Sequence, residues 1–335
     1  MTWINAICIE EELHICKNAS MHIRPTPEVI TVAHTKGGAG KSTLTSNLAF
    51  ALAQRGRRVL VVDLDKQCGQ TMLLGLSGPR IDRLSRQPVD SGAVLRGVAR
   101  LHEGVWRDVH PNLDVLPAHE HSLAQASDEL VAEGVAGQVR LYEVLYDQRD
   151  WDVVLLDTPG TQSPLLTFAL TASTGVLVPA IPEAGPVAEL RTVLDHIRFV
   201  GEVTESTEVV GVVRMRVGGN ANYRAVAERR IRELCTEYDV PLLRNKVPED
   251  AKLGEAQLAG LPVGAYLPMS RSAIAFRYLA EEIDLALLAR THGEPSAAAP
   301  LECAAGGPAE RALSGWAGQS AGEPGAAAPA PSPVR

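Results

Sequence analysis

The chain reads Lys36-Gly37-Gly38-Ala39-Gly40-Lys41-Ser42-Thr43 shortly after its first strongly apolar segment. Residues 29–33 are β-branched and bounded by turn residues, so they predict a buried strand, and residues 44–53 carry apolar side chains at helical spacing. A strand, a glycine-rich loop and a helix in this order are typical of a phosphate-binding loop. Such glycines let successive N–H groups point at an anion, and the helix N-terminus adds a partial positive charge. We therefore expect Lys41 to reach the phosphates of a nucleotide and the Ser42 hydroxyl to ligate Mg²⁺.

The loop departs from the usual pattern at its first position. A glycine normally stands five residues before the Gly-Lys pair, but this chain has Thr35 there, followed by Lys36 and two glycines. This is the deviant Walker A pattern, and on it the chain resembles the ParA/MinD family of P-loop ATPases, in particular the ParA (Soj-like) partition branch. The resemblance implies that Lys36 reaches the phosphates bound by a partner subunit, as an arginine finger does. It also implies that ATP contacts Lys36, Gly37, Gly38, Ala39, Gly40, Lys41, Ser42, Thr43 and Pro248.

A second apolar run, residues 59–62, ends in two carboxylates, Asp63 and Asp65. Open α/β sheets bind their ligands at the carboxyl ends of such strands. The segment is similar to the family's second signature, Asp-x-Asp-Pro-Gln with a threonine four residues after the glutamine. The resemblance implies that Asp65 positions the attacking water and that Lys36 and Lys41 are the other catalytic residues. It also implies that Asp63 lies near Mg²⁺. Two solvated acids at a strand end are the alternative. The matches are Asp63, Asp65, Gln67 and Thr71, while Lys66 replaces the usual proline and Cys68 a common glycine.

A third signature follows at residues 151–160. Four apolar residues end in Asp157, as in a Walker B strand, and Asp157 is expected to hold the Mg²⁺ directly or through a water. The turn Thr158-Pro159-Gly160 then lies under the γ-phosphate, where the resemblance places a second switch. A buried strand that ends in aspartate is a weak signal by itself, but its order after the other two signatures makes it specific.

The remaining pattern alternates strands with helices. Further apolar runs predict strands at 112–117, 175–180 and 209–213, and helices are expected near 91–102, 122–133 and 137–148, over 184–200 and over 271–290, with a connecting loop over 260–268. Six alternations predict an α/β fold with a doubly wound, mostly parallel sheet flanked by helices, which is the P-loop NTPase fold.

We divide the chain into three parts. Residues 1–28 are an N-terminal extension, 29–291 a ParA-like ATPase domain, and 292–335 an Ala/Pro/Gly-rich tail that we expect to be disordered. The extension holds four side chains that can ligate a metal, but their spacing matches no familiar zinc site. These are Cys8, His14, Cys16 and His22.

One basic stretch contrasts with the net charge of −8. Residues 214–232 hold six arginines and one acid, Glu228. ParA proteins bind non-specific DNA through basic residues on this side of their dimer, and phosphate contacts need positive charge rather than base reading. The alternative is that this stretch is the solvated face of a helix. The chain also departs from the family at Glu249, where the family often has arginine. The resemblance implies DNA contacts by Arg214, Arg216, Arg224, Arg229, Arg230 and Lys252.

The composition limits the cellular setting. The five cysteines are scattered, odd in number and without CxxC spacing, which suits a reducing cytoplasm. No apolar run approaches the roughly 18 residues of a membrane-spanning helix. MinD proteins end in a basic amphipathic membrane helix, and the tail here lacks such a face. We expect a cytoplasmic, nucleoid-associated protein without a membrane partner.

These signatures together predict an ATP-dependent switch. The resemblance implies a homodimer with ATP between its subunits, binding to non-specific DNA, and hydrolysis that is slow until a ParB-type centromere-binding protein stimulates it. Its task would be plasmid or chromosome partition, or the positioning of another cargo. A metabolic ATP-dependent enzyme or a MinD-like positioning ATPase on the same fold is the alternative. An iron–sulfur reductase needs suitably placed cysteines, and Cys68 and Cys235 lie in no such motif.

Overall fold

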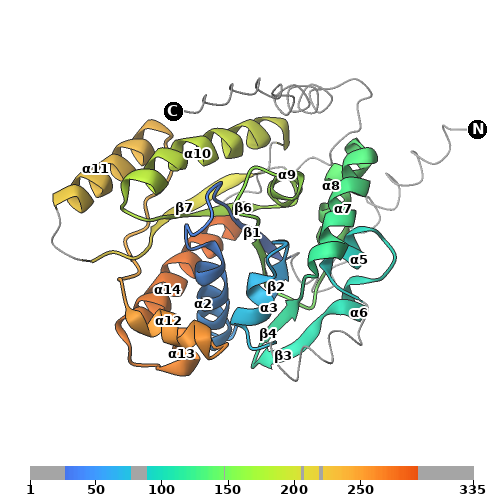
Figure 1. Cartoon of the computed structure of the whole chain (residues 1–335), viewed down its shortest axis with the longest axis horizontal. Helices are drawn as coiled ribbons and strands as arrows, with labels where there is room; N and C mark the ends of the chain where they lie inside the picture. The colour runs from blue at the N-terminus through green and yellow to red at the C-terminus, as the bar shows by residue number, and fades with distance from the viewer. Residues whose placement is uncertain (1–26, 77–88, 147, 205–206, 219–221, 293–335) are drawn as a thin grey trace, which may run out of the picture.

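The computed structural model describes residues 27–76, 89–146, 148–204, 207–218 and 222–292. The predicted N-terminal extension, with Cys8, His14, Cys16 and His22, and the predicted tail lie almost entirely outside these ranges. The strands of the described part form one seven-stranded sheet in the order β3-β4-β2-β5-β1-β6-β7 (Figure 1). The strands are β1 (Glu28–Val32), β2 (Val59–Asp63), β3 (Trp106–His110), β4 (Leu113–Leu116), β5 (Val153–Asp157), β6 (Gly175–Ala180) and β7 (Glu208–Arg214).

The sheet is parallel except at one edge. All neighbouring strands pair in parallel apart from β3 and β4, which are antiparallel. All residues of β2, β5 and β6 are buried, as expected for strands that are covered on both faces and therefore consist of apolar runs. The prediction of a doubly wound, mostly parallel α/β sheet is confirmed.

Helices cover both faces of the sheet (Figure 1). Side chains alternate along each strand, so Val59 and Val61 join the core under one set of helices while Leu60 and Val62 join the core under the other. The first face is covered by α2 (Lys41–Gln54), α12 (Ala251–Leu258), α13 (Val263–Tyr266) and α14 (Arg271–His292). The second is covered by α7 (Glu120–Ala132), α8 (Val135–Tyr146), α9 (Pro164–Thr171), α10 (Ala184–Thr204) and α11 (Asn222–Glu237). No helix in the described ranges is long and apolar enough to cross a bilayer.

The structure differs from the sequence prediction in several places. The prediction of one helix near 91–102 is wrong. This segment forms two short helices, α5 (Ser91–Leu95) and α6 (Leu101–Gly104), and Gly97 between them has a φ of +70°. The predicted loop over 260–268 contains the short helix α13, and α12 was not predicted. The edge strand β3 was also missed, because none of its residues is fully buried and it lacks an apolar alternation.

Trp151, which lies just before β5, contacts the edge of the sheet that β3 and β4 form. Its indole is buried, and Nε1 donates a hydrogen bond of 2.8 Å to Asp114 Oδ2. The same carboxylate oxygen accepts a hydrogen bond of 3.0 Å from Arg107, whose guanidinium carbon lies 4.7 Å from the centre of the indole ring. One buried ring and one carboxylate thus tie β3 to β4 and to the start of β5.

We expect Trp151→Phe to lower the free energy of unfolding by about 2 kcal/mol, since it removes a buried hydrogen bond to a charged group. Urea unfolding followed by circular dichroism measures this change. Trp106→Phe is the matched control, because the buried Nε1 of Trp106 has no hydrogen-bond partner among the described residues. Equal losses for the two variants would show that only ring volume matters here.

Candidate functional site

The glycine loop connects β1 to α2 at the carboxyl edge of the sheet. Gly38 and Gly40 have φ values of +76° and +90°, a region that side chains disfavour. Gly40 is the N-cap of α2 and provides no side-chain cap, so the first N–H groups of the helix face the loop. A helix N-terminus of this kind suits a phosphate.

The sheet register brings the other two signatures to the same place. Asp157, the last residue of β5, pairs with Val32 at the end of β1 and with Asp63 at the end of β2. All three strands are central and parallel, so their carboxyl ends meet at one edge. The structure therefore brings together the glycine loop, the Asp63–Asp65 segment and Asp157, as the sequence predicts.

Lys41 is buried among carboxylates. Only 5% of its surface is exposed, and burial lowers the pKa of its ammonium group, while the charges of Asp157 and Asp65 oppose that shift. Gly160 packs directly on this region: a Cβ there would lie 2.9 Å from Gly37 Cα and 3.2 Å from Lys41 Nζ. The turn after β5 can therefore approach the loop only because residue 160 has no side chain.

Asp157 is fully buried and held by hydrogen bonds. Thr45 Oγ1 donates to its Oδ1 over 3.2 Å, and Gln70 Nε2 donates to its Oδ2 over 3.0 Å. Burial raises the pKa of Asp157 to about 6, although hydrogen bonds from Gln70 and Ser42 and the charge of Lys41 act in the opposite direction. A carboxylate next to a serine hydroxyl is a donor set that fits Mg²⁺, which prefers oxygen ligands.

Asp63 organises the loop that follows β2. Its Oδ1 accepts a hydrogen bond of 3.1 Å from the Asp65 N–H, and its Oδ2 accepts one of 3.1 Å from the Gln70 N–H. Burial, followed by the charge of Asp157, raises the pKa of Asp63 well above its usual range. Asp63 thus fixes the backbone next to the site, and its predicted place near Mg²⁺ stays a prediction.

Asp65 lies closer to solvent than Asp63. It is half-buried, and its Oδ1 accepts a hydrogen bond of 3.0 Å from the Gln67 N–H. Its charge acts on both Lys41 and Asp157, so it faces the region where the phosphates are expected. This arrangement suits a carboxylate that orients a water, which stays a prediction for Asp65.

Lys36 lies against the start of α10 in this single chain. Its N–H donates to His34 Nδ1 over 3.1 Å, and a Cβ on Gly185 would collide with Lys36 Nζ. The predicted reach of Lys36 to a partner subunit stays a prediction.

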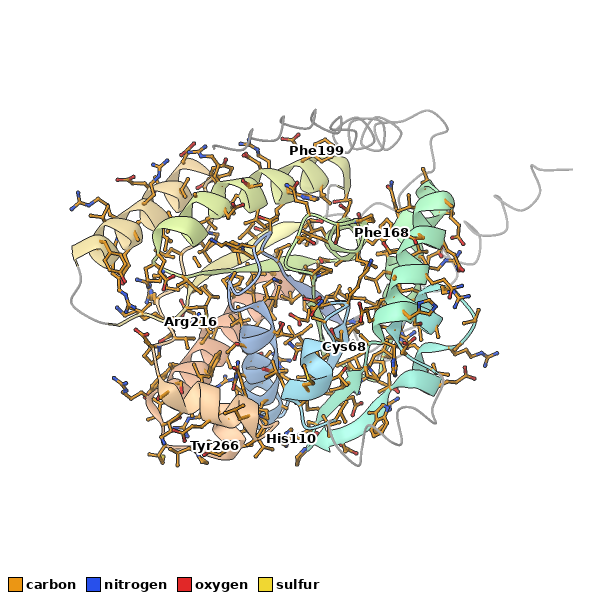
Figure 2. The ribbon with its side chains drawn as sticks, viewed as in Figure 1. Cys68, His110, Phe168, Phe199, Arg216 and Tyr266 are labelled. Atoms are coloured by element: carbon orange, nitrogen blue, oxygen red, sulfur yellow. The ribbon has the colours of Figure 1, made fainter. Side chains whose placement is uncertain are left out.

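The position of Cys68 shows why a glycine is common there. Cys68 has a φ of +52° and lies just before the short helix α3 (Gly69–Leu73), near the middle of the molecule in Figure 2. Burial raises the pKa of its thiol to about 11, which makes the thiolate scarce. The next residue, Gly69, lets α3 approach the glycine loop, because a Cβ there would lie 3.2 Å from Ser42 Oγ.

Three residues of the site were missed by the sequence analysis. They are Thr45, Gln70 and Gln257, whose Nε2 donates to Thr43 Oγ1 over 2.8 Å. Thr45 stands four residues after Lys41, so helical spacing could have placed it on the same face of α2. No such signal exists for Gln70 or Gln257, because their partners lie far away along the chain.

Pro248 lies beyond the carboxyl end of β7. It forms an isolated bridge with Val217, and the nearby Met215 is the side chain that a Cβ on Gly40 would meet, at 3.6 Å. Pro248 is therefore at the same edge of the sheet as the glycine loop. Its contact with a nucleotide stays a prediction.

Most of the predicted DNA-binding residues make polar contacts within the chain, and their contact with DNA stays a prediction. Arg224 pairs with Glu249 at 2.7 Å, Arg230 with Glu233 at 3.1 Å, and Lys252 with Glu255 at 2.7 Å. Arg214 instead donates to the backbone carbonyls of Leu243 and Arg244. Within the described ranges, the exposed residues Arg216 (labelled in Figure 2) and Arg229 make no ion pair. Much of the positive charge is thus compensated locally.

Comparison with known proteins agrees with this geometry. A family described as an AAA domain matches residues 27–208. The chromosome-partitioning ATPase Soj of Thermus thermophilus is 33% identical over 261 residues, which cover 76% of this chain and 94% of Soj.

Two solved structures with bound nucleotide share the fold. The septum site-determining protein MinD of Pyrococcus horikoshii, complexed with Mg-ADP, has a TM-score of 0.61 and 26% identity, covering 77% of this chain and 96% of MinD. Cobyrinic acid a,c-diamide synthase of Mycobacterium smegmatis, with ADP and magnesium, has a TM-score of 0.62 and 27% identity, covering 76% of this chain and 93% of the synthase. With the deviant Walker A loop and the two aspartate signatures converging at one edge of the sheet, the chain belongs to the ParA/MinD family of P-loop ATPases.

Proposed function

We propose that this chain is an ATP-driven switch that binds ATP with Mg²⁺, hydrolyses it and positions a cargo on DNA. The observation that carries the proposal is the convergence of Lys41, Ser42, Asp65 and Asp157 at one edge of the sheet. Soj and MinD, which share the family, support a positioning ATPase over other roles.

Each group has a distinct task in this proposal. The loop N–H groups and Lys41 hold the phosphates, and the buried ammonium gains an anionic partner there. Ser42 and Asp157 hold Mg²⁺, which neutralises charge on the phosphates when bound. Asp65 orients a water toward the γ-phosphate. Two subunits close over ATP, and Lys36 of one reaches the phosphates held by the other.

We further propose that the closed dimer binds DNA without sequence preference and that hydrolysis releases it. A ParB-type centromere-binding protein is the partner that speeds hydrolysis, and partition of a plasmid or chromosome is the task. A nucleoid-associated, cytoplasmic location follows from this reading. The similarity to cobyrinic acid a,c-diamide synthase keeps a metabolic ATP-dependent enzyme as the second candidate.

We expect Asp65→Ala to lower the rate of ATP hydrolysis about a hundredfold or more, because the attacking water loses its orienting carboxylate. Its affinity for ATP should stay near that of the wild type, whereas Lys41→Ala should lose ATP binding. Phosphate release and titration with a fluorescent ATP analogue measure the two effects. Asp128→Ala, at an exposed position of α7, is the control. Unchanged hydrolysis in Asp65→Ala would contradict the assigned role.

We expect Arg216→Glu with Arg229→Glu to weaken ATP-dependent retention of non-specific duplex DNA about tenfold or more and to reduce its salt dependence, since two phosphate contacts are lost. The measurement is DNA retention at several salt concentrations, with ATP and without nucleotide. Arg140→Glu is the control: Arg140 lies on α8 and pairs with Glu133 at 2.9 Å. A wild type that hydrolyses ATP yet holds no DNA in any nucleotide state would favour the metabolic candidate.

A further inference from the structure

Gln70 connects three parts of the site through one side chain. It is fully buried in the first turn of α3, and its Nε2 lies 2.8 Å from the Ser42 carbonyl oxygen and 3.0 Å from Asp157 Oδ2. Both neighbours are acceptors, which fixes the amide nitrogen on this side. Gln70 therefore joins the glycine loop to the carboxylate at the end of β5, although Ser42 and Asp157 lie 28 and 87 residues away along the chain.

The backbone of Gln70 continues this connection. Its N–H donates to Asp63 Oδ2, and the other oxygen of Asp63 accepts from the Asp65 N–H. Both ends of the loop that carries Asp65 are thus fixed to one buried carboxylate. The side chain of Gln70 also donates a hydrogen bond to Asp157. The loop that carries Asp65 and the Asp157 carboxylate are therefore held in a fixed position relative to each other.

Asp157 keeps room for a further donor in this arrangement. Its Oδ1 accepts from Thr45 Oγ1 and its Oδ2 from Gln70 Nε2, and each carboxylate oxygen has two lone pairs. Ser42 also hydrogen-bonds this carboxylate, so three of its four lone pairs are used and one is left for a further donor. Gln70 therefore orients the carboxylate without blocking it.

The other end of the amide is an acceptor whose protein partner is missing. Gln70 Oε1 is buried and has no hydrogen-bond partner within the described residues. A buried carbonyl left in this state costs free energy, so it suits a donor that arrives with a ligand. Mg²⁺ usually keeps several of its waters when it binds a protein, and those waters are donors.

We propose that Gln70 is a positioning residue of the Mg²⁺–nucleotide site, whose amide holds Asp157 and the Asp65 loop in the arrangement that hydrated Mg²⁺ requires. The inference rests on the proposed ATPase function. It assigns to Gln70 a task that acts through Asp157, as residues behind metal ligands commonly do.

The test compares Gln70→Met, which is similar in size but cannot hydrogen-bond in the same way, with the wild type. The dissociation constant of fluorescent ADP is measured in excess Mg²⁺ and in excess EDTA. We expect the ratio of the two constants, which is the gain from Mg²⁺, to fall about tenfold or more in Gln70→Met. The constant in EDTA should stay near that of the wild type. Hydrogen exchange over residues 63–73 should speed up, because the loop loses one of its anchors.

Gln54→Leu, at an exposed position near the end of α2, is the control and should leave both constants unchanged. If Gln70→Met does not fold, Gln70→Asn keeps a polar amide in the buried space but is one methylene too short for both acceptors. An unchanged gain from Mg²⁺, or an equal loss in Mg²⁺ and in EDTA, would overturn the role of Gln70 while leaving the ATPase proposal in place. A wild type whose ADP affinity does not respond to Mg²⁺ would overturn both.

Discussion

Two buried carboxylates stand side by side at the centre of this molecule, and the surrounding structure is arranged to accommodate them. Asp63 and Asp157 are paired in register at the ends of β2 and β5, and both are fully buried. Burial raises the pKa of each, and a neighbouring charge adds to the rise: that of Asp157 for Asp63, and that of Asp65 for Asp157. An unpaired carboxylate in a protein interior is costly, so each must be surrounded by donors. The donors come from α2, from α3 and from the loop between β2 and α3.

This requirement explains why short polar segments next to an apolar sheet are held by hydrogen bonds. The strands supply a rigid platform because alternate side chains enter two separate cores. The loops have no such core, and hydrogen bonds to Asp63 and Asp157 take its place. Thr158 makes a similar connection, since its hydroxyl donates to the Val32 carbonyl at 2.8 Å and ties the turn after β5 to the end of β1.

The sequence predicts the platform better than it predicts the connections. Buried parallel strands consist of apolar runs, so β1, β2, β5, β6 and β7 were expected, and the glycine loop follows from local residue types. Gln70 was not expected, because its role depends on partners brought near by the fold. The same limit applies to the prediction of charged surfaces. A count of arginines over 214–232 cannot reveal that Arg224 pairs with Glu249, which lies in another segment. Local patterns thus predict elements, whereas pairing depends on tertiary structure.

The free-energy cost of burying Asp63 and Asp157 is explained by the ligand that the site is expected to bind, a divalent cation with a nucleotide. The buried Lys41 lies near Asp157 and Asp65, and the buried Asp63 pairs with Asp157, so carboxyl groups outnumber cations at the site. A divalent cation would compensate these carboxyl groups, and the phosphates of a nucleotide would provide an anionic partner for Lys41 and the N–H groups of the loop. A chain selected for stability alone would replace such a cluster with apolar residues. Its presence in a well-packed sheet is therefore best understood as stability given up for the binding of a cation and a nucleotide.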